Sequence, residues 1–351
     1  MLNLLIPPFF FSCAITLIFT PLTIALAKKL KLVDDPKLHK HPAVIHKKTL
    51  PRAGGLPVYL AILIASLIFL PTDRTFIAIF FAGLLVVVIG LLDDRFDLSP
   101  YLRFIGNIVC ASIVVFSGLH IPFITNPLGG ILNFANFSFS FLGLVISLPV
   151  ILAIFWIVWV MNMLNWSKGV DGQMPGIAVV SALIIGIASL RFATLNEVNI
   201  IASQASFIVA GASLGFLFYN FYPAKIFPGY SATILGFMLG VLSIMSGVKL
   251  ATAVLVMGVP TADFLFIFIR RILSHRSPFK GDNEHLHHLL LKVGVKQRTI
   301  AIIYWLMSLL LGMFAFTLSS RGKLFAIILV LVIVGFLIWT LRFLIKRSEI
   351  E

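Results

Sequence analysis

Two adjacent acids, Asp93 and Asp94, are followed closely by a third, Asp97. The loop that carries them is short, so we expect the three carboxylates to lie near one another. Neighbouring carboxylates repel one another unless a cation or a proton is shared between them. Such an oxygen site suits Mg²⁺, which keeps several waters and binds substrate phosphates. The alternative is a solvated turn in which an Asp caps the following helix.

A second group of polar residues follows in the stretch NMLNWSKGVDGQMPG. Asn162 and Asn165 are one helical turn apart and therefore share a helix face. The chain then opens into a Gly-rich loop with Lys168 and Asp171. These side chains could ligate a metal or bind a nucleotide, but Asn and Asp also favour helix ends and turns. From this stretch alone, the turn interpretation is favoured.

Three histidines, His285, His287 and His288, lie within four residues beside Asp282 and Glu284. Grouped imidazoles can bind a metal or donate hydrogen bonds to phosphate. His285 and His288 would share a helix face. Since no third strong ligand is nearby, contact with a phosphate or nucleotide is favoured over zinc.

Cations and turn-forming residues characterise two further loops. The Pro- and Gly-broken stretch YNFYPAKIFPGY carries Asn220 and Lys225, and an earlier basic stretch carries Lys47 and Arg52. Lys and Arg bind phosphate as point charges or as forks. The basic residues of the earlier loop are equally typical of a segment that stops membrane insertion.

The elements that position these residues are apolar. Of the 351 residues, 60% are hydrophobic and 11% charged, which excludes a soluble globular domain and a disordered chain. Crossing a bilayer core takes about 20 residues of helix, and about eleven apolar segments approach that length. We predict an all-α polytopic integral membrane protein, forming one domain over residues 1–351. The segments are roughly residues 2–27, 55–71, 75–92, 101–118, 146–165, 174–191, 198–218, 231–246, 249–270, 299–318 and 322–345.

The basic charge indicates the orientation. Most of the 27 Lys and Arg fall in loops on one side of the predicted membrane, which by the positive-inside rule is cytoplasmic. The N-terminus is then outside and the C-terminus cytoplasmic, and the net charge of +14 reflects topology rather than a nucleic-acid partner. The uncharged external connection, about 119–145, has turn signals typical of a short β-hairpin. The cytoplasmic loops are about 28–54, 92–100, 165–173, 219–230 and 271–298.

The chemistry-bearing residues gather in or next to these cytoplasmic loops. A transporter would instead be expected to place ionisable groups near the membrane midplane, often on broken helices. The one-sided placement therefore disfavours a transporter of lipid-linked sugars. It favours a site at the interface, where a soluble substrate meets a lipid one. Cys13 and Cys110 lie in apolar segments, so neither a disulfide framework nor a cysteine metal cluster is expected.

Taken in order, the motifs resemble a known family. They are the D-D pair at 93–94, N-x-x-N-x-x-x-G-x-D-G at 162–172, P-A-K-I-F-x-G at 223–229 and S-P-F-x-x-D-x-x-H-x-H-H at 277–288. The combination resembles the polyprenyl-phosphate N-acetylhexosamine-1-phosphate transferases, and more distantly the phospho-muramoyl-pentapeptide transferase. The resemblance implies eleven helices, a bacterial plasma membrane and a cytoplasmic active site.

The resemblance also implies a reaction and a role for each site residue. The reaction transfers a sugar phosphate from a UDP-N-acetylhexosamine to undecaprenyl phosphate, releasing UMP, with Mg²⁺ as cofactor. Asp93 would deprotonate or orient the lipid phosphate, and Asp94 would help to hold the metal. The other implied positions are Asn165 and Asp171 in the metal and catalytic site, Asn162, Lys168, Asn220 and Lys225 for the nucleotide sugar, His285, His287 and His288 for its phosphates and sugar, and Lys47 and Arg52 for the lipid phosphate.

Two positions depart from the family pattern, since Tyr230 and Lys168 stand where acids are usual. Tyr offers only a phenol, a poor Mg²⁺ ligand at a pKa near 10. Lys168 could contact phosphate directly as a fixed cation. A non-catalytic relative that binds polyprenyl phosphate or a nucleotide sugar is therefore the alternative interpretation. A homodimer is also left open by the sequence.

Overall fold

The computed structural model describes residues 2–35, 49–141, 144–191, 197–248, 250–275, 277 and 283–348. Lys47 and Asp282 lie outside the described residues. The elements, in chain order, are α1 (Leu2–Lys29), β1 (Val33–Asp34), β2 (Leu50–Pro51), α2 (Gly55–Phe69), α3 (Arg74–Phe96), α4 (Pro100–Phe116), β3 (Phe123–Thr125), β4 (Ile131–Asn133), β5 (Ser138–Phe141), β6 (Leu144–Ser147), α5 (Leu148–Trp166), α6 (Gln173–Leu190), α7 (Glu197–Asn220), α8 (Thr233–Met245), α9 (Leu250–Val256), α10 (Gly258–Leu273), α11 (Leu286–Lys292), α12 (Gln297–Thr317) and α13 (Ser320–Ser348).

Each predicted apolar segment is helical. Among the described residues, 7 helices are long and apolar enough to cross a membrane, namely α1, α3, α5, α6, α7, α12 and α13. The segment predicted at 249–270 is broken into α9 and α10, which meet at an angle of 85° and raise the total to 8 if they form one span. Helices α2, α4 and α8 are apolar but shorter. The chain is therefore a polytopic membrane protein, with seven or eight membrane-capable helices in the part that the structure describes.

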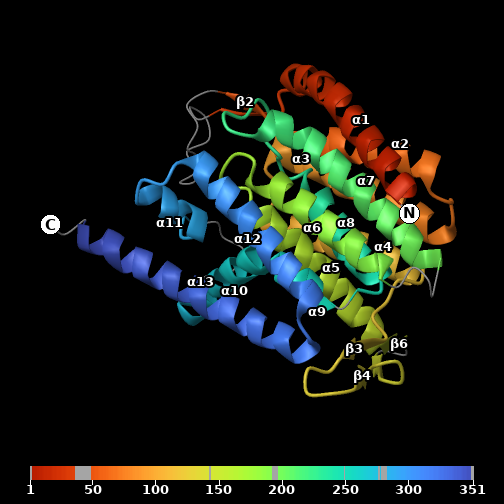
Figure 1. Ribbon diagram of the computed structural model, residues 1–351. Helices are drawn as coiled ribbons and strands as arrows, with labels where there is room; N and C mark the ends of the chain where they lie inside the picture. The colour runs from red at the N-terminus through yellow and green to blue at the C-terminus, as the bar shows by residue number, and fades with distance from the viewer. Residues whose placement is uncertain are drawn as a thin grey trace.

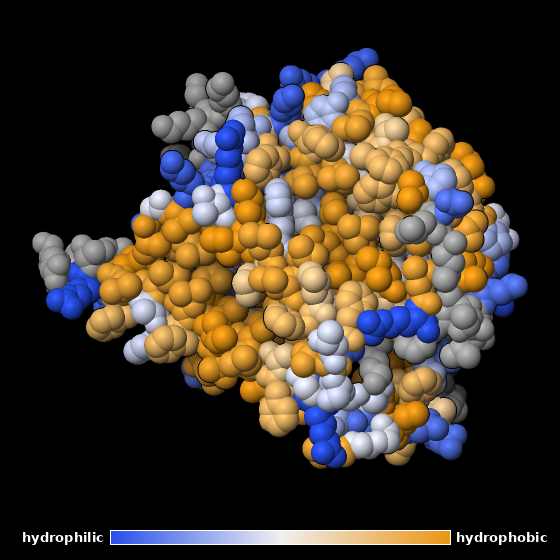
Figure 2. Space-filling view, viewed as in Figure 1, coloured by the Kyte–Doolittle hydropathy of each residue, from blue (hydrophilic) through white to orange (hydrophobic). Residues whose placement is uncertain are grey.

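The helices pack side by side, with α7 between α1 and α6 (Figure 1). A Cβ on Gly211 of α7 would lie 2.0 Å from the carbonyl oxygen of Phe9 in α1, so only glycine allows this close approach. Figure 2 shows apolar surface across the side of the bundle, with hydrophilic residues gathered mainly toward its two ends. This distribution suits a lipid environment for the side of the bundle.

The two ends of the bundle carry different structures. At one end lie the N-terminus and the strands between α4 and α5, and at the other lie β2, α11 and the C-terminus (Figure 1). Strand β3 pairs with β4 and β5 with β6, both antiparallel, so the predicted hairpin is confirmed and is followed by a second one. The loops with the candidate site residues gather at the end opposite the hairpins.

Candidate active site

The acidic pair lies at the end of α3. Asp93 and Asp94 are buried in its last turn, whereas Asp97 ends the helix with a left-handed backbone (φ 48°) and is exposed. Asp97 therefore differs from the buried pair in its exposure, although its backbone N–H donates to the carbonyl of Asp93 at 2.9 Å. Ser99 then caps α4, with its side chain accepting from the backbone N–H of Leu102 at 3.3 Å. The short connection brings the first turns of α4 beside the acidic pair.

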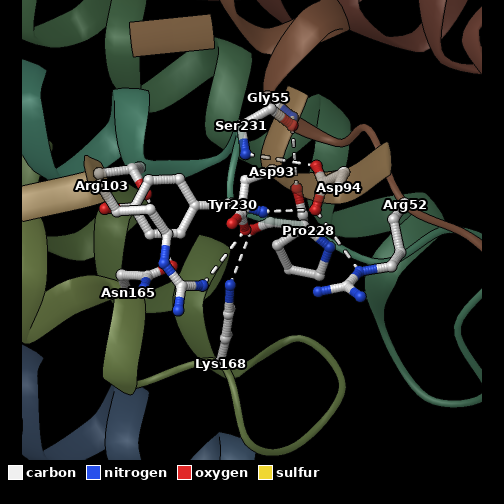
Figure 3. A network of polar contacts seen from close by, with 12 residues as sticks. Arg52, Gly55, Asp93, Asp94, Arg103, Asn165, Lys168, Pro228, Tyr230 and Ser231 are labelled. Atoms are coloured by element: carbon white, nitrogen blue, oxygen red, sulfur yellow. Dashed lines mark hydrogen bonds and ion pairs between the residues drawn. The ribbon is translucent and has the colours of Figure 1, made fainter. Parts of the chain in front are cut away.

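Asp94 is surrounded by backbone amides. Its Oδ1 accepts from the N–H of Tyr230 at 2.8 Å, and its Oδ2 from the N–H of Ser231 at 3.4 Å (Figure 3). The 229–231 turn approaches so closely that a Cβ on Gly229 would lie 2.2 Å from Oδ2, and φ at this glycine is +66°. Arg52 completes the shell with its Nε 3.4 Å from Oδ1. Asp94 thus anchors the turn between α7 and α8.

Arg52 is positioned by a small sheet. Strand β1 pairs with β2, and Arg52, the next residue, forms an isolated parallel β-bridge with Phe227. The N–H of Phe227 donates to the carbonyl of Pro51 at 2.8 Å. The N–H of Gly54 returns a bond to the carbonyl of Phe227 at 3.2 Å. These backbone bonds join the first loop to the 219–230 loop and hold Arg52 against Asp94.

Asp93 has a different environment from its neighbour. Its Oδ2 lies 3.3 Å from a terminal nitrogen of Arg103 in α4, and only 2% of its side chain is exposed. Its Oδ1 is buried and has no hydrogen-bond partner among the described residues. One oxygen of Asp93 is therefore available for a ligand, while both oxygens of Asp94 are occupied.

Lys168 and Tyr230 occupy the space beside the acidic pair (Figure 3). The Nζ of Lys168 donates to the carbonyl of Gly229 at 2.9 Å and lies 5.7 Å from the centre of the Tyr230 ring. The guanidinium carbon of Arg103 lies 5.3 Å from that ring centre. A phenol ring attracts cations through its face, so Tyr230 supports both cations without carrying a charge.

Burial is the largest cause of the pKa shifts of Lys168 and Tyr230. Burial, followed by the nearby Arg52, lowers the pKa of Lys168 to about 8, although Asp94 and Asp93 oppose the shift. Burial also raises the pKa of Tyr230 to about 12. Its hydroxyl accepts from the Nδ2 of Asn107 at 3.0 Å. The tyrosine is therefore neutral at physiological pH.

The predicted polar residues of the third and fourth loops hold these loops together. The side chain of Asn220 accepts from the N–H of Gly172 at 3.0 Å and donates to the carbonyl of Ile226 at 2.9 Å. Asp171 Oδ2 accepts from the N–H of Ala224 at 3.0 Å. Lys225 is exposed, with its ammonium 5.7 Å from the ring of Tyr219.

The two predicted asparagines of α5 differ. Asn165 is buried, and its Oδ1 lies 3.5 Å from the hydroxyl of Thr233, so it faces the 229–233 turn. Asn162 donates to the carbonyl of Val158 in its own helix at 2.8 Å. The structure therefore brings Asn165, but not Asn162, into the network of Figure 3.

The histidines form a packed cluster beside the Lys168 loop. His285 Nδ1 lies 2.9 Å from Asp263 Oδ2, whose other oxygen accepts from the N–H of Leu286 at 2.9 Å. The His285 and His287 rings are stacked 5.5 Å apart, and His287 lies 4.3 Å from His288. Burial, His288 and His285 lower the pKa of His287 well below its ordinary value, so it is neutral.

The cluster and the Lys168 loop are in direct contact. A Cβ on Gly169 would lie 1.8 Å from His287 Nε2, so the loop packs against this ring without a gap. Glu284 instead forms ion pairs with Arg270 and Arg342. This acid therefore ties α13 and α10 to the histidine loop.

Sequence reasoning missed three of the contributing residues. Arg103 and Asn107 lie one turn apart on α4, and Asp263 lies on α10, inside predicted apolar segments. The only available signal was an uncommon polar residue in an apolar helix, which in a membrane protein marks a functional position by default.

The residues at the acidic pair do not fit a Mg²⁺ site. Magnesium requires several oxygen ligands at short range in near-octahedral geometry. Both oxygens of Asp94 bind backbone amides, Tyr230 keeps its proton, and Asp93 offers one oxygen. The described residues include no group of three or more His, Cys, Asp or Glu side chains that could hold a metal.

Comparisons with known proteins agree with this architecture. Residues 76–247 match the glycosyl transferase family 4 profile. The chain is 30% identical over 94% of its length to the probable undecaprenyl-phosphate N-acetylglucosaminyl 1-phosphate transferase of Bacillus subtilis, covering 89% of that protein. The chain belongs to glycosyl transferase family 4.

Two further relatives place this family 4 protein among lipid-phosphate enzymes. The chain is 31% identical to the decaprenyl-phosphate N-acetylglucosaminephosphotransferase of Mycobacterium leprae, over 88% of this chain and 81% of the relative. It is 28% identical to the undecaprenyl-phosphate alpha-N-acetylglucosaminyl 1-phosphate transferase of Thermotoga maritima, over 85% of this chain and 87% of the relative. The matched 76–247 segment contains Asp93, Asp94 and Lys168, whereas Arg52 and the histidines lie outside it.

Proposed function

We propose that this family 4 protein transfers N-acetylhexosamine 1-phosphate from a UDP-sugar to undecaprenyl phosphate and releases UMP. Family membership and the names of the relatives support the reaction class. The observation that carries the proposal is a pair of buried carboxylates faced by Arg52, Arg103 and Lys168 at one end of an apolar bundle. That place suits two phosphorylated substrates, one soluble and one embedded in lipid.

The reaction requires one displacement at phosphorus. An oxygen of the lipid phosphate forms a bond to the sugar-bearing phosphorus, the bond from that phosphorus to the bridging oxygen breaks, and UMP leaves with that oxygen. Asp93 Oδ1, which has no partner among the described residues, accepts the proton of the lipid phosphate or orients it. The surrounding cations stabilise the charge on the transferring group.

The remaining predicted residues have supporting roles in this proposal. Asp94 fixes the 229–231 turn rather than touching substrate. The His285–His288 cluster and exposed Lys225 lie on loops that the nucleotide sugar would contact. Lys47 would bind the phosphate of the lipid substrate. Mg²⁺ is expected from the family resemblance alone, because the residues at the acidic pair do not fit a magnesium site.

We also propose the finer topology. Residues 1–351 form one domain with eleven helical crossings, in which α2, α4, α8 and the bent α9–α10 pair complete the seven longer helices. The N-terminus is outside, and the active site and C-terminus are cytoplasmic in a bacterial plasma membrane. The excess of Lys and Arg at the end of the bundle with the active site supports this orientation. Assembly as a homodimer is a further proposal that sedimentation in detergent tests.

The test is a transfer assay in detergent. Purified protein receives undecaprenyl phosphate and radiolabelled UDP-N-acetylglucosamine, with and without Mg²⁺, and lipid-linked sugar and UMP are both measured. Equal amounts of the two products are expected. UMP without lipid-linked sugar would indicate hydrolysis, and neither product with any UDP-N-acetylhexosamine would contradict the proposal.

A non-catalytic binding protein is the second candidate. The observation that favours it is the replacement of acids by Lys168 and Tyr230 beside Asp93. Retained binding of UDP-N-acetylglucosamine without any product would support this candidate.

A further inference from the structure

The charges at the acidic pair are arranged as a cation-rich site. Two buried carboxylates, Asp93 and Asp94, are faced by Arg52, Arg103 and Lys168, which all interact electrostatically with this pair. Adding a divalent cation would place two more positive charges among three that are already fixed. Adding an anionic phosphate group would instead meet an excess of positive charge.

Lys168 is held in place rather than free to swing away. Its ammonium donates to the carbonyl of Gly229, the residue that also packs on Asp94. On its other side, the next residue, Gly169, packs against His287. The position of the charge is therefore fixed before any ligand binds, which is the condition for efficient electrostatic stabilisation.

Lys168 also has unused hydrogen-bonding capacity. An ammonium group has three N–H donors, and the Gly229 carbonyl takes one of them. The ammonium interacts electrostatically with Asp93, whose Oδ1 has no hydrogen-bond partner among the described residues. A diphosphate group that entered here would meet the remaining N–H donors of Lys168, and the phosphate of the lipid substrate would meet Asp93 Oδ1 as the acceptor for its proton.

We propose that Lys168, together with Arg52 and Arg103, binds the diphosphate of the nucleotide sugar in place of a divalent cation, so that the protein binds this substrate and acts on it without Mg²⁺. The identity of the ligand rests on the proposed function. The role of Lys168 as the fixed cation rests on the contacts described above. Tyr230 completes the site, because its neutral ring leaves the cations free to bind an anion.

The first experiment measures binding and transfer separately. Binding of UDP-N-acetylglucosamine to the full-length protein in detergent is followed by calorimetry in EDTA and in Mg²⁺, and transfer is assayed in the same two buffers. We expect affinities in the two buffers to agree within about threefold, well under the tenfold that corresponds to 1.4 kcal/mol. Transfer is expected in EDTA as well as in Mg²⁺.

Variants identify the cation responsible. Lys168→Met keeps the length of the side chain but removes its charge, and we expect affinity in EDTA to fall by about tenfold or more. The matched control is Lys346→Met, which removes an exposed lysine near the end of α13 and should leave affinity unchanged. Equal affinities of the Lys168→Met and wild-type proteins would overturn the role of Lys168.

A second variant keeps the proposal testable if Lys168→Met does not fold. The double variant Lys168→Asp, Tyr230→Asp restores acids at the two positions where the family pattern has them. It should supply oxygen ligands and make binding of the nucleotide sugar depend on Mg²⁺. Direct titration with Mg²⁺ should give heat with this variant and none with the wild-type protein. Mg²⁺ binding by the wild-type protein at the same concentrations would contradict the inference.

The outcomes separate this inference from the proposed function. Transfer that requires Mg²⁺ would confirm the proposed function and overturn the inference that the protein acts on the nucleotide sugar without Mg²⁺. Nucleotide-sugar binding in EDTA that depends on Lys168, without product in either buffer, would support Lys168 as the cation that binds the diphosphate and would contradict both the proposed function and action without Mg²⁺. Absence of both binding and transfer in either buffer would overturn both.

Discussion

Asp93 and Asp94 are neighbours in the sequence but have different duties. Both carboxylate oxygens of Asp94 accept hydrogen bonds from backbone amides, so this residue determines where the 229–231 turn lies. Asp93 pairs with Arg103 through one oxygen and leaves the other without a partner among the described residues. One of the adjacent acids is thus a structural anchor, and the other keeps an oxygen for the reactive role that we propose, a division that residue type alone does not reveal.

Replacing Asp93 with Asn tests this division. Asp93→Asn keeps the shape of the side chain but removes the base, so we expect transfer to fall by about 10²–10⁴-fold, the usual contribution of a general base. Asp97→Asn is the matched control, because Asp97 is exposed and Asn tolerates its left-handed backbone. Rates are measured with both substrates saturating. Unchanged transfer by Asp93→Asn would show that this acid is not catalytic.

Lys168 predicts a pH dependence of substrate binding. Its pKa, lowered mainly by burial to about 8, means that the ammonium is present below about pH 8 and is lost above it. Affinity for UDP-N-acetylglucosamine should therefore fall as pH rises through 8, approaching about tenfold per pH unit if binding needs the charge. The groups that face this ammonium are Arg52, Asp94, Asp93, Arg103 and the ring of Tyr230.

The control for this titration is Lys168→Arg. A guanidinium stays charged throughout this range, so the variant should bind with little pH dependence between 7 and about 9.5. Calorimetry at several pH values gives both curves. The same decline in both proteins would assign the titration to another group, such as the ligand or a different lysine.

At the scale of elements, glycines allow the helices to hold the 229–232 turn. A Cβ on Gly90 of α3 would lie 2.2 Å from the Cα of Ser231. A Cβ on Gly55 of α2 would lie 2.0 Å from the carbonyl oxygen of Ser231. The Ser231 hydroxyl accepts from the N–H of Gly55 at 3.2 Å. The turn therefore lies directly against two helix backbones.

Gly90→Ala should displace this turn. The new methyl group meets backbone rather than a flexible side chain, so we expect a loss of about 1–3 kcal/mol in stability and a larger loss of transfer. Gly83→Ala is the control in the same helix, because its nearest neighbours are side-chain atoms of Ile234 and Tyr59 at 3.1 Å. Thermal unfolding in detergent and the transfer rate are compared. Equal effects of the two substitutions would contradict the close packing of the turn.

The elements were more predictable than their contacts. Hydropathy located the apolar helices to within a few residues because burial in lipid requires long apolar runs, but it did not locate the short helix α11, which lies in a predicted loop. The break between α9 and α10 was missed, since the apolar run continues across it. The sequence also does not predict that the Asn220 amide bonds Gly172 and Ile226, because tertiary packing decides which polar groups an amide meets.

At the scale of the whole molecule, the two ends of the bundle should face different compartments. The β3–β6 hairpins lie at one end, and the active site, α11 and the C-terminus at the other (Figure 1). The wild-type cysteines, Cys13 and Cys110, are both buried, so an introduced exposed cysteine can be labelled selectively. The orientation of the proposed active site can therefore be measured in living cells.

Asn136→Cys in the hairpin region and Lys292→Cys at the end of α11 are exposed positions for this test. The charge distribution predicts that the hairpin end is outside. A membrane-impermeant maleimide should label Asn136→Cys in intact cells, whereas Lys292→Cys should be labelled only after permeabilisation. The wild-type protein controls for background labelling. The reverse pattern would place the cation-rich site outside, away from a cytoplasmic UDP-sugar, and would contradict the proposed reaction together with the topology.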